Sequence, residues 1–222
     1  MRQNVQKTHM VKKRKKPAPS KVRTPRQKRS IERKRLLMDT AFRLFSRHGV
    51  HAVTSNRIAA EAGIPIGSFY SYFRDKKALL LEVLGEYLER FMLTMMPPGE
   101  RFDATVPLAD VPAIVRRYLE RMFTAFDLAP DFHRETMLLK YTDADIRRIY
   151  DEYEKREIGF IVVFLKRNAH RLKPRDIHAA AKVIHAAAEN AGHSLCFLAY
   201  PMARERIIRE LTALISGYLA GK

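Results

Sequence analysis

The chain has 222 residues, 46% of them hydrophobic, with 42 Lys and Arg against 24 Asp and Glu and a formal net charge of +18. It is long enough for one large core or two modest domains, and its charge favours a polyanionic partner such as nucleic acid. A single cysteine, Cys196, excludes an internal disulfide framework. No apolar run reaches the roughly 18 residues of a membrane-spanning helix, and no secretory signal is evident. We therefore expect a soluble cytoplasmic protein.

The basic residues are unevenly distributed, and the first 29 residues carry many of them. This segment holds twelve Lys and Arg, no Asp or Glu, three prolines and few apolar side chains. Such a composition cannot build a core, so residues 1–29 are expected to form a disordered basic arm. Its charge would suit contacts with DNA phosphates. Alternatively, the arm is a solubilising tail, or an upstream extension of a chain whose working start is Met10.

Helical periodicity begins at Ser30, which can cap a helix whose apolar residues recur at spacings of three and four. Thr54 can cap a second, short helix that ends at Gly63, and Pro65 opens a third. Asp75 can cap a longer fourth helix, which ends before two consecutive prolines. The expected helices span about residues 30–49, 54–63, 65–72 and 75–96.

The third helix is unusually aromatic, with four rings in the segment AGIPIGSFYSYFRDK at residues 62–76. Two short helices joined by a glycine-bearing turn, after a longer support helix, form the pattern of a helix-turn-helix, whose second helix enters the major groove of DNA. Phe69 and Phe73 are four residues apart, so we expect both to anchor this helix to the core. Tyr70 and Tyr72 point elsewhere, where their hydroxyls could reach phosphate oxygens.

The stretch TSNRIAAEAGIPIGSFYSYFRDK at residues 54–76 resembles the DNA-binding signature of the TetR family of bacterial transcriptional regulators, with similarity over about residues 30–80. It joins a helix-turn-helix to the aromatic pair, a spaced lysine and a long following helix. The resemblance implies an all-α homodimer, in which an N-terminal three-helix DNA-binding domain precedes a helical ligand-binding and dimerisation domain. It also implies a repressor that leaves a palindromic operator when a small apolar or amphipathic inducer binds.

Carried over by position, the resemblance assigns contacts with DNA to eight residues. Two would lie at a phosphate at the start of the second helix, three would face bases, and three would hold the DNA backbone. In that order they are Thr54 and Ser55; Ile66, Gly67 and Ser68; and Tyr70, Tyr72 and Lys76. The chain departs from the family in having tyrosine at position 72, where histidine is common, and in its longer basic arm. The alternative for each residue is a packing or surface role.

The resemblance divides the chain into a DNA-binding domain at residues 30–76, with its motif at about 54–73, and a ligand-binding and dimerisation domain at 77–222. Further helices are expected over about residues 110–127, 131–141, 143–168, 174–199 and 202–219, without competing strand alternation. Large apolar side chains in this part could line a pocket for an apolar ligand, or could form ordinary core. By family analogy the pocket would include Tyr118, Met122, Phe126, Met137 and Tyr141.

The segment DIHAAAKVIHAAAENAGHSLCFLAY at residues 176–200 carries a polar stripe opposite a face of small residues. The stripe includes His185, Glu189 and His193 at successive intervals of four. These side chains could bind a transition metal, could offer hydrogen bonds to a ligand in the pocket, or could face solvent or their copies across a dimer axis. The three span about 12 Å along the helix, too far for one metal ion, so no metal site is predicted. The pocket interpretation adds all three to the predicted ligand contacts.

Two other functional classes compete with a regulator. An enzyme could use the His, Cys and Glu side chains of the stripe, but the sequence has no Gly-rich phosphate loop and no nucleophile elbow. We therefore predict no catalytic residues and no cofactor. A non-specific DNA-compacting protein would explain the basic arm but not a large apolar C-terminal segment. The predicted partners are double-stranded DNA with an inverted-repeat operator, a second copy of the chain and an unidentified small-molecule inducer, with no membrane and with association to the bacterial nucleoid.

Overall fold

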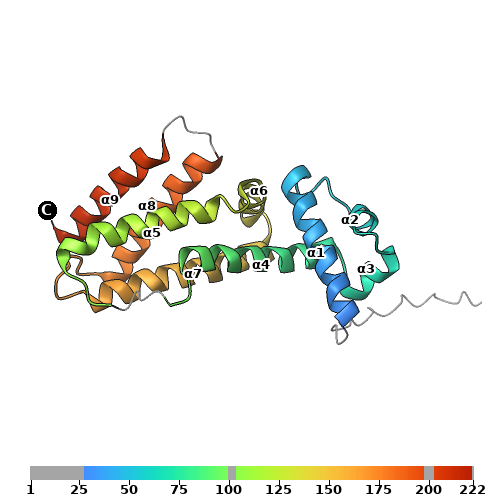
Figure 1. The fold of residues 1–222 in the computed structure, drawn as a ribbon, viewed down its shortest axis with the longest axis horizontal. Coiled ribbons are helices and arrows are strands. Elements are labelled where there is room, and N and C mark those ends of the chain that lie inside the picture. Colours follow the sequence, from blue (N-terminus) through green and yellow to red (C-terminus); the bar gives the residue numbers. More distant parts are fainter. Residues whose placement is uncertain (1–27, 100–103, 198–202, 222) are drawn as a thin grey trace, which may run out of the picture.

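A computed structural model describes residues 28–99, 104–197 and 203–221 of the chain. Within these residues it contains nine α-helices, one short 3-10 helix and no strand, so the predicted all-α fold is confirmed. The elements are α1 (Lys28–His48), α2 (Ser55–Glu61), α3 (Ile66–Tyr72), α4 (Lys76–Met95), η1 (Leu108–Asp110), α5 (Val111–Phe126), α6 (Pro130–Lys140), α7 (Ala144–Arg167), α8 (Ile177–Phe197) and α9 (Arg204–Ala220). The molecule is elongated, with α2 and α3 at one end and the last turns of α9 at the other (Figure 1).

Two of the predicted capping side chains cap α2 and α4. The Thr54 side chain accepts a hydrogen bond from the Arg57 amide at the start of α2. The Asp75 side chain accepts one from the Ala78 amide at the start of α4. Each bond satisfies an amide that has no partner within its own helix, and losing such a cap costs about 1 kcal/mol.

Ser30 does not cap the first helix, contrary to the prediction from sequence. Helix α1 begins two residues earlier, at Lys28, and the Ser30 hydroxyl donates to the hydroxyl of Tyr72 at 3.1 Å. Of the predicted basic arm, residues 28 and 29 are therefore helical, and residues 1–27 lie outside the described part of the chain.

Helices α1, α2 and α3 pack around a small apolar core. Phe69 and Phe73 are almost fully buried, with ring centroids 5.7 Å apart, so the predicted anchoring of the third helix is confirmed. Phe45 from α1 and Ile58 from α2 lie in the same core. Gly63 joins α2 to α3 with a φ of 64°, a left-handed conformation that glycine adopts at little cost. Burying one phenylalanine stabilises the fold by roughly 1.5–3 kcal/mol, so the aromatic pair fixes α3 firmly.

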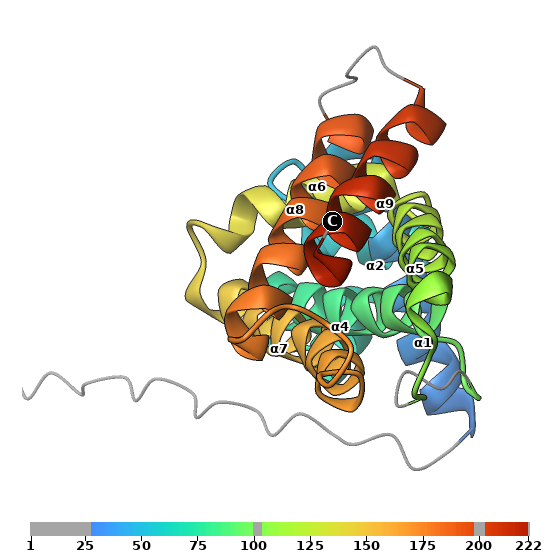
Figure 2. The ribbon, with the colours of Figure 1, turned by 90° about the vertical axis from the view of Figure 1, so that its left-hand side faces the viewer.

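The rest of the chain forms a bundle of α4, α5, α7, α8 and α9. Helices α8 and α9 lie together on one side of it, and α4 and α7 lie along another (Figure 2). Helix α4 packs on α1 near its start and on α5 and α7 further along, while α6 packs on α1, α7 and α8. Helices α4 and α6 thus join the two parts of the molecule. Among the described helices, none has both the length and the apolarity needed to cross a membrane.

Candidate DNA-binding surface and ligand cavity

Helix α3 is anchored on one face and open on the other. Ile66, Gly67 and Tyr70 are exposed, whereas Ser68 is half-buried. A Cβ added at Gly67 would meet no atom within 4 Å, so the small residue is not required by the fold itself. A glycine at this position leaves room for the close approach that a helix makes in the major groove.

Tyr72 and Lys76 make internal contacts that the sequence does not reveal. Tyr72 is half-buried, and its hydroxyl accepts the hydrogen bond from Ser30. The Lys76 ammonium donates to the carbonyls of Val50 and Val53, both at 2.7 Å, and burial lowers the pKa of this lysine. Lys76 therefore secures the loop between α1 and α2. The predicted phosphate contacts of Tyr72 and Lys76 stay predictions, as do those of Thr54 and Ser55 at the start of α2.

Helix α6 holds the same loop from the other side. The Glu135 carboxylate accepts a hydrogen bond from the Val50 amide at 2.9 Å. Gly49 precedes it with a φ of 77°, and a Cβ there would lie 2.9 Å from the Glu135 carboxylate oxygen. The loop that leads into α2 is thus fixed jointly by Lys76 from α4 and by Glu135 from α6.

We expect Glu135→Ala to lower the free energy of unfolding by about 1–3 kcal/mol, because the Val50 amide loses its acceptor in a partly buried site. Glu135→Gln retains an acceptor oxygen and should lose less. Asp131→Ala is a matched control on the same helix, because that exposed carboxylate pairs only with Arg134 among the described residues. Urea unfolding followed by circular dichroism measures all three. A Glu135→Ala protein as stable as the Asp131→Ala protein would contradict a holding role for Glu135.

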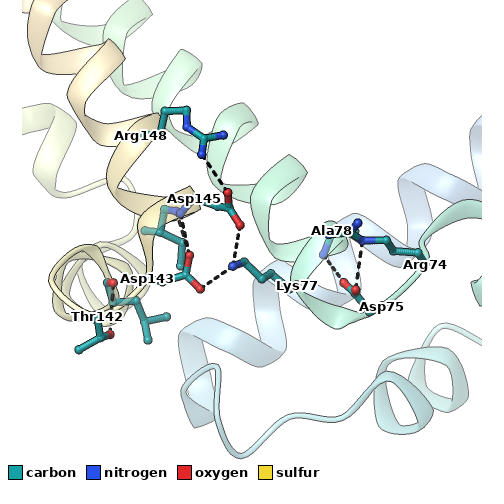
Figure 3. A network of polar contacts seen from close by, with 10 residues as sticks. Arg74, Asp75, Lys77, Ala78, Thr142, Asp143, Asp145 and Arg148 are labelled. Carbon is teal, nitrogen blue, oxygen red and sulfur yellow. Dashed lines mark hydrogen bonds and ion pairs between the residues drawn. The ribbon is translucent and has the colours of Figure 1, made fainter.

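A second tie joins the start of α4 to α7. The Lys77 ammonium lies 2.8 Å from Asp143 and 2.7 Å from Asp145, and Arg148 reaches Asp145 as well (Figure 3). The hydrogen bonds from Lys77 lower the pKa of both aspartates. These groups are exposed, so solvent screens their attraction and the pair contributes little stability. The contacts mainly fix a position, because they hold Lys77, the residue after Lys76, against the C-terminal bundle.

An apolar cavity of about 50 Å³ lies between α5, α7, α8 and α9. Its wall is apolar apart from Tyr118, whose hydroxyl is buried without a hydrogen-bond partner among the described residues. Burial raises the pKa of Tyr118, and the charges of Glu157 and Glu189 act in the same direction. The other residues lining this apolar cavity include Ile114, Phe160, Phe164, Ile184, Ile215 and Leu219.

A second, polar cavity of about 30 Å³ is lined by other residues of α7 and α8: Ile184 lines the apolar cavity and the next residue, His185, lines the polar one. Helices α4, α5 and α6 complete its wall. Its apolar and aromatic lining residues are Leu88, Phe91, Met95, Met122, Phe126, Tyr150 and Tyr153. Its titratable lining residues include His133, Lys140, Glu154, Glu157, His185 and Glu189.

His185 organises the carboxylates of the polar cavity. Its Nε2 forms a hydrogen bond with the Glu157 carboxylate at 2.8 Å, and its Nδ1 lies 3.7 Å from the Glu189 carboxylate. Burial by itself lowers the pKa of His185, but the hydrogen bond and charge of Glu157, with further carboxylates, raise it overall. Burial raises the pKa of Glu189. The carboxylate of Glu154 is paired instead with Lys182 and, at 3.7 Å, with Lys140.

A chain of buried polar rings crosses the bundle beside this cavity. The Tyr87 hydroxyl shares a hydrogen bond with Nδ1 of His133 at 3.0 Å, and Nε2 of His133 lies 3.3 Å from Nε2 of His193. Burial lowers the pKa of His133 to about 3, and burial with the charge of Lys140 lowers the pKa of His193 to about 4. Both imidazoles are therefore neutral near pH 7. The chain links α4, α6 and α8.

The structure divides the predicted ligand contacts. Met122, Phe126, His185 and Glu189 line the polar cavity, and Tyr118 lines the apolar one. His193 lies beside the polar cavity on His133. Met137 is half-buried against the core, and Tyr141 is 72% exposed at the end of α6, so neither belongs to the wall of either cavity. Among the described residues no group of three or more side chains is arranged to hold a metal ion.

Sequence reasoning missed several polar residues of the cavity. His133 and Lys140 lie on α6, and Glu154 and Glu157 lie on α7. On α7 a signal existed, because Tyr150, Glu154 and Glu157 recur at spacings of four and three and so share one face with buried residues. On α6 the chain gives no comparable signal.

The DNA-binding part of the chain is similar in sequence to a known protein family and to known regulators. The family model described as "Bacterial regulatory proteins, tetR family" matches residues 37–83, which run from α1 to the middle of α4. These residues carry the DNA-binding domain of the TetR family of bacterial regulatory proteins. The HTH-type regulator YuxN of Bacillus subtilis is 39% identical over 59 residues, which are 27% of this chain and 20% of that protein. A regulator of Staphylococcus aureus, SAB2452, is 37% identical over 65 residues, 29% of this chain and 35% of the relative. The chain thus matches between a fifth and about a third of the length of these curated relatives.

Solved structures extend the likeness in fold to most of the chain. A regulator from Saccharomonospora viridis, determined in complex with choline, has a TM-score of 0.70 at 18% identity and covers 86% of this chain and 100% of its own. A TetR-like regulator from Rhodococcus sp. RHA1 has a TM-score of 0.61 at 21% identity, over 90% of this chain and 100% of its own. At these identities the shared property is the fold, including the bundle that follows the TetR helix-turn-helix.

Proposed function

We propose that this TetR-family regulator is a repressor, which binds an inverted-repeat operator as a homodimer and leaves it when a small molecule enters the C-terminal bundle. The observation that carries the proposal is the position of α4 and α6. These two helices line the polar cavity through Phe91 and His133, and the same helices hold the loop before α2 through Lys76 and Glu135. A ligand in the cavity therefore acts on elements that position the DNA-reading head.

We propose that residues 30–76 form the DNA-binding domain and that residues 77–222 bind the ligand and form the dimer. Residues 1–29 are proposed to form a basic arm that contacts DNA phosphates. In the head, Ile66, Gly67 and Ser68 would face bases. Tyr70 would reach a phosphate from the exposed face of α3, next to the buried anchor Phe69.

The dimer is proposed to form through α8 and α9. Apolar side chains are exposed along these two helices, with Val183 60%, Leu214 62% and Tyr218 47% exposed, and they border a surface groove. Exposed apolar patches of this kind mark association surfaces, and an isologous interface uses one patch on both subunits. A dimer of this type would place two copies of α3 on one side for an inverted repeat.

Leu214→Glu should convert the dimer to monomer, because two copies of the charge would be buried near the axis without partners. Leu138→Glu is the matched control, since Leu138 is similarly exposed at 65% but lies on α6 and does not line the groove between α8 and α9. Analytical ultracentrifugation of both variants gives the masses. A dimeric Leu214→Glu protein, or a monomeric Leu138→Glu protein, would move the proposed interface elsewhere.

Induction is proposed to work by opening the bundle. Cavities of about 50 and 30 Å³ are smaller than an organic inducer, so a ligand must select a state in which the helices around them have moved. A ligand that prefers this state 100-fold supplies about 2.7 kcal/mol per site against DNA binding. The neighbour from Saccharomonospora viridis was determined in complex with choline, which supports a small-molecule ligand for a protein of this fold.

The test is a footprint on duplexes selected from a random DNA library. We expect two half-sites about one helical turn apart or somewhat more, with two protomers bound. Tyr70→Ala should weaken binding to selected and random duplexes alike and reduce the dependence on salt by about one phosphate contact. A single asymmetric half-site with one protomer bound is incompatible with the proposed mode.

A further inference from the structure

We infer that the ligand taken up by the polar cavity is an organic ammonium cation with a short apolar body. This inference rests on the proposed function only in treating the cavity as the ligand site. It names the chemical class of the ligand, which follows from the charges, rings and unpaired polar atoms of the cavity wall.

The first observation is an excess of carboxylates over cations in the cavity wall, with three carboxylates against Lys140 and His185. Glu157 and Glu189 share one partner, His185, which hydrogen-bonds Glu157 at 2.8 Å and stays 3.7 Å from Glu189. Lys140 and Lys182 are both placed at Glu154 and not at this pair. Among the described residues no hydrogen bond reaches the Glu189 carboxylate. The Glu189 side chain is 32% exposed and its nearest cation lies at 3.7 Å, so part of its charge is removed from water without a close partner. A ligand cation at Glu189 would therefore be favoured.

The second observation is the aromatic composition of the same wall. Phe91, Phe126, Tyr150 and Tyr153 line the polar cavity, and Phe91 meets Phe126 edge to face at a centroid distance of 5.3 Å. One ring of this wall already has an ammonium group over its face, since Nζ of Lys140 lies 5.4 Å from the centroid of the Tyr150 ring. Aromatic faces attract such cations, most strongly where water is excluded. The same wall would accept the alkylated ammonium of a ligand.

An anionic ligand is disfavoured by the same geometry. The basic side chains of the wall, Lys140 and His185, already lie against Glu154 and Glu157. An incoming carboxylate or phosphate would meet three carboxylates and would have to displace one of them from its partner. Like charges brought together in a buried site repel strongly.

The apolar cavity accounts for the body of the ligand. Consecutive residues of α8, Ile184 and His185, line the apolar and the polar cavity respectively, and apart from Tyr118 the wall of the apolar cavity offers only apolar side chains. The Tyr118 hydroxyl and Nδ1 of His185 are both buried and unpaired among the described residues, and both lie close to Glu189. A ligand with its ammonium at Glu189 and a short alkyl chain toward Phe160 would fill both cavities once the helices part.

The test is calorimetric titration of the full-length chain, without DNA, with hexyltrimethylammonium, hexanol and hexanoate. We expect the cation to bind at least tenfold more tightly than the neutral and anionic probes. Glu189→Gln should remove this preference while leaving hexanol binding unchanged, and Glu152→Gln, an exposed change on α7, should behave as wild type. Thermal unfolding without ligand checks folding, and Glu189→Gln should be at least as stable as wild type because it removes a partly buried charge whose nearest partner lies at 3.7 Å.

Hexanoate binding more tightly than the cation, or an unchanged preference in a folded Glu189→Gln protein, would overturn the inference. Operator affinity, with and without the cation, is measured in a separate experiment. If the cation binds as expected but operator affinity does not change, the ligand class stands and the proposed induction fails. If operator binding is specific but none of the three probes shows the cation preference, the ligand class fails and the DNA-binding function stands.

Discussion

Phe69→Ala should lower the free energy of unfolding by about 3–5 kcal/mol and abolish specific DNA binding. Phe69 is completely buried beneath α3 and contacts Phe73, so its removal leaves a cavity under a helix of only seven residues. Such a short helix has little stability of its own and depends on this packing. Urea unfolding monitored by circular dichroism gives the stability, and fluorescence anisotropy with labelled duplex gives the affinity.

Tyr70→Ala is the matched control, one residue further along the same helix. Tyr70 is 46% exposed and touches Phe69 only edge to face, so its loss should cost at most about 1 kcal/mol of stability. DNA affinity should nevertheless fall. If Tyr70→Ala destabilised the fold as much as Phe69→Ala, or if it left DNA binding unchanged, the assignment of anchor and contact faces to α3 would be wrong.

Acid should destabilise the protein through His133 and His193. His133 and His193 have folded-state pKa values of about 3 and about 4, below the ordinary value of 6.5, because His133 is buried and His193 is partly buried beside the charge of Lys140. The unfolded chain therefore binds more protons than the folded one below pH 6.5. Their contribution to stability is complete above pH 6.5 and is lost as the pH falls toward 4. The free energy of unfolding should decrease by about 1.4 kcal/mol per pH unit for each imidazole.

His193→Gln isolates this effect. The amide can still hydrogen-bond Nε2 of His133 but does not titrate, so the slope of stability against pH between 6.5 and 4 should fall by about one proton. His178→Gln changes an exposed histidine of the same helix and serves as the matched control. His185 acts in the opposite sense, because its raised pKa gives stability that is lost as the pH rises through that pKa. Unfolding curves at several pH values give the free energy of unfolding at each pH. Equal slopes against pH for His193→Gln and wild type would contradict a neutral His193 imidazole in the folded protein.

The helix-turn-helix could be predicted from the sequence because its signals are local. Thr54 and Asp75 cap helices within three residues, and the spacing of Phe69 and Phe73 defines one face of a helix. The start of α1 could not be placed this way. Ser30 has the chemistry of a cap, but its hydroxyl is used by Tyr72, 42 residues away.

The contacts that join head to bundle could not be predicted, because they connect distant segments. Glu135 meets Val50 across 85 residues, and Lys76 reaches back 26 residues to the same loop. A lysine at the start of a helix reads equally well as a phosphate contact and as an internal donor. Only the tertiary arrangement shows that Lys76 has two carbonyl partners.

The cavity was predictable in part. The helical wheel places His185 and Glu189 on one stripe, but it cannot say which neighbours that stripe meets. The structure places Glu157 within hydrogen-bond distance of His185. Tyr141 is the C-cap residue of α6 and lies exposed at the surface. Gly192 shows the same limit: a Cβ there would overlap the ring of Phe126, a contact that the sequence alone does not indicate.

Sequence-specific DNA binding is tested most directly by a ratio of affinities at one salt concentration. The full-length chain is titrated into a duplex selected from a random library and into a scrambled duplex of the same composition, with fluorescence anisotropy as the readout. We expect the selected duplex to bind at least about 10³-fold more tightly, as specific regulators do, with two protomers per duplex. Equal affinity for both duplexes would contradict an operator-binding regulator and would favour a protein that compacts DNA without regard to sequence.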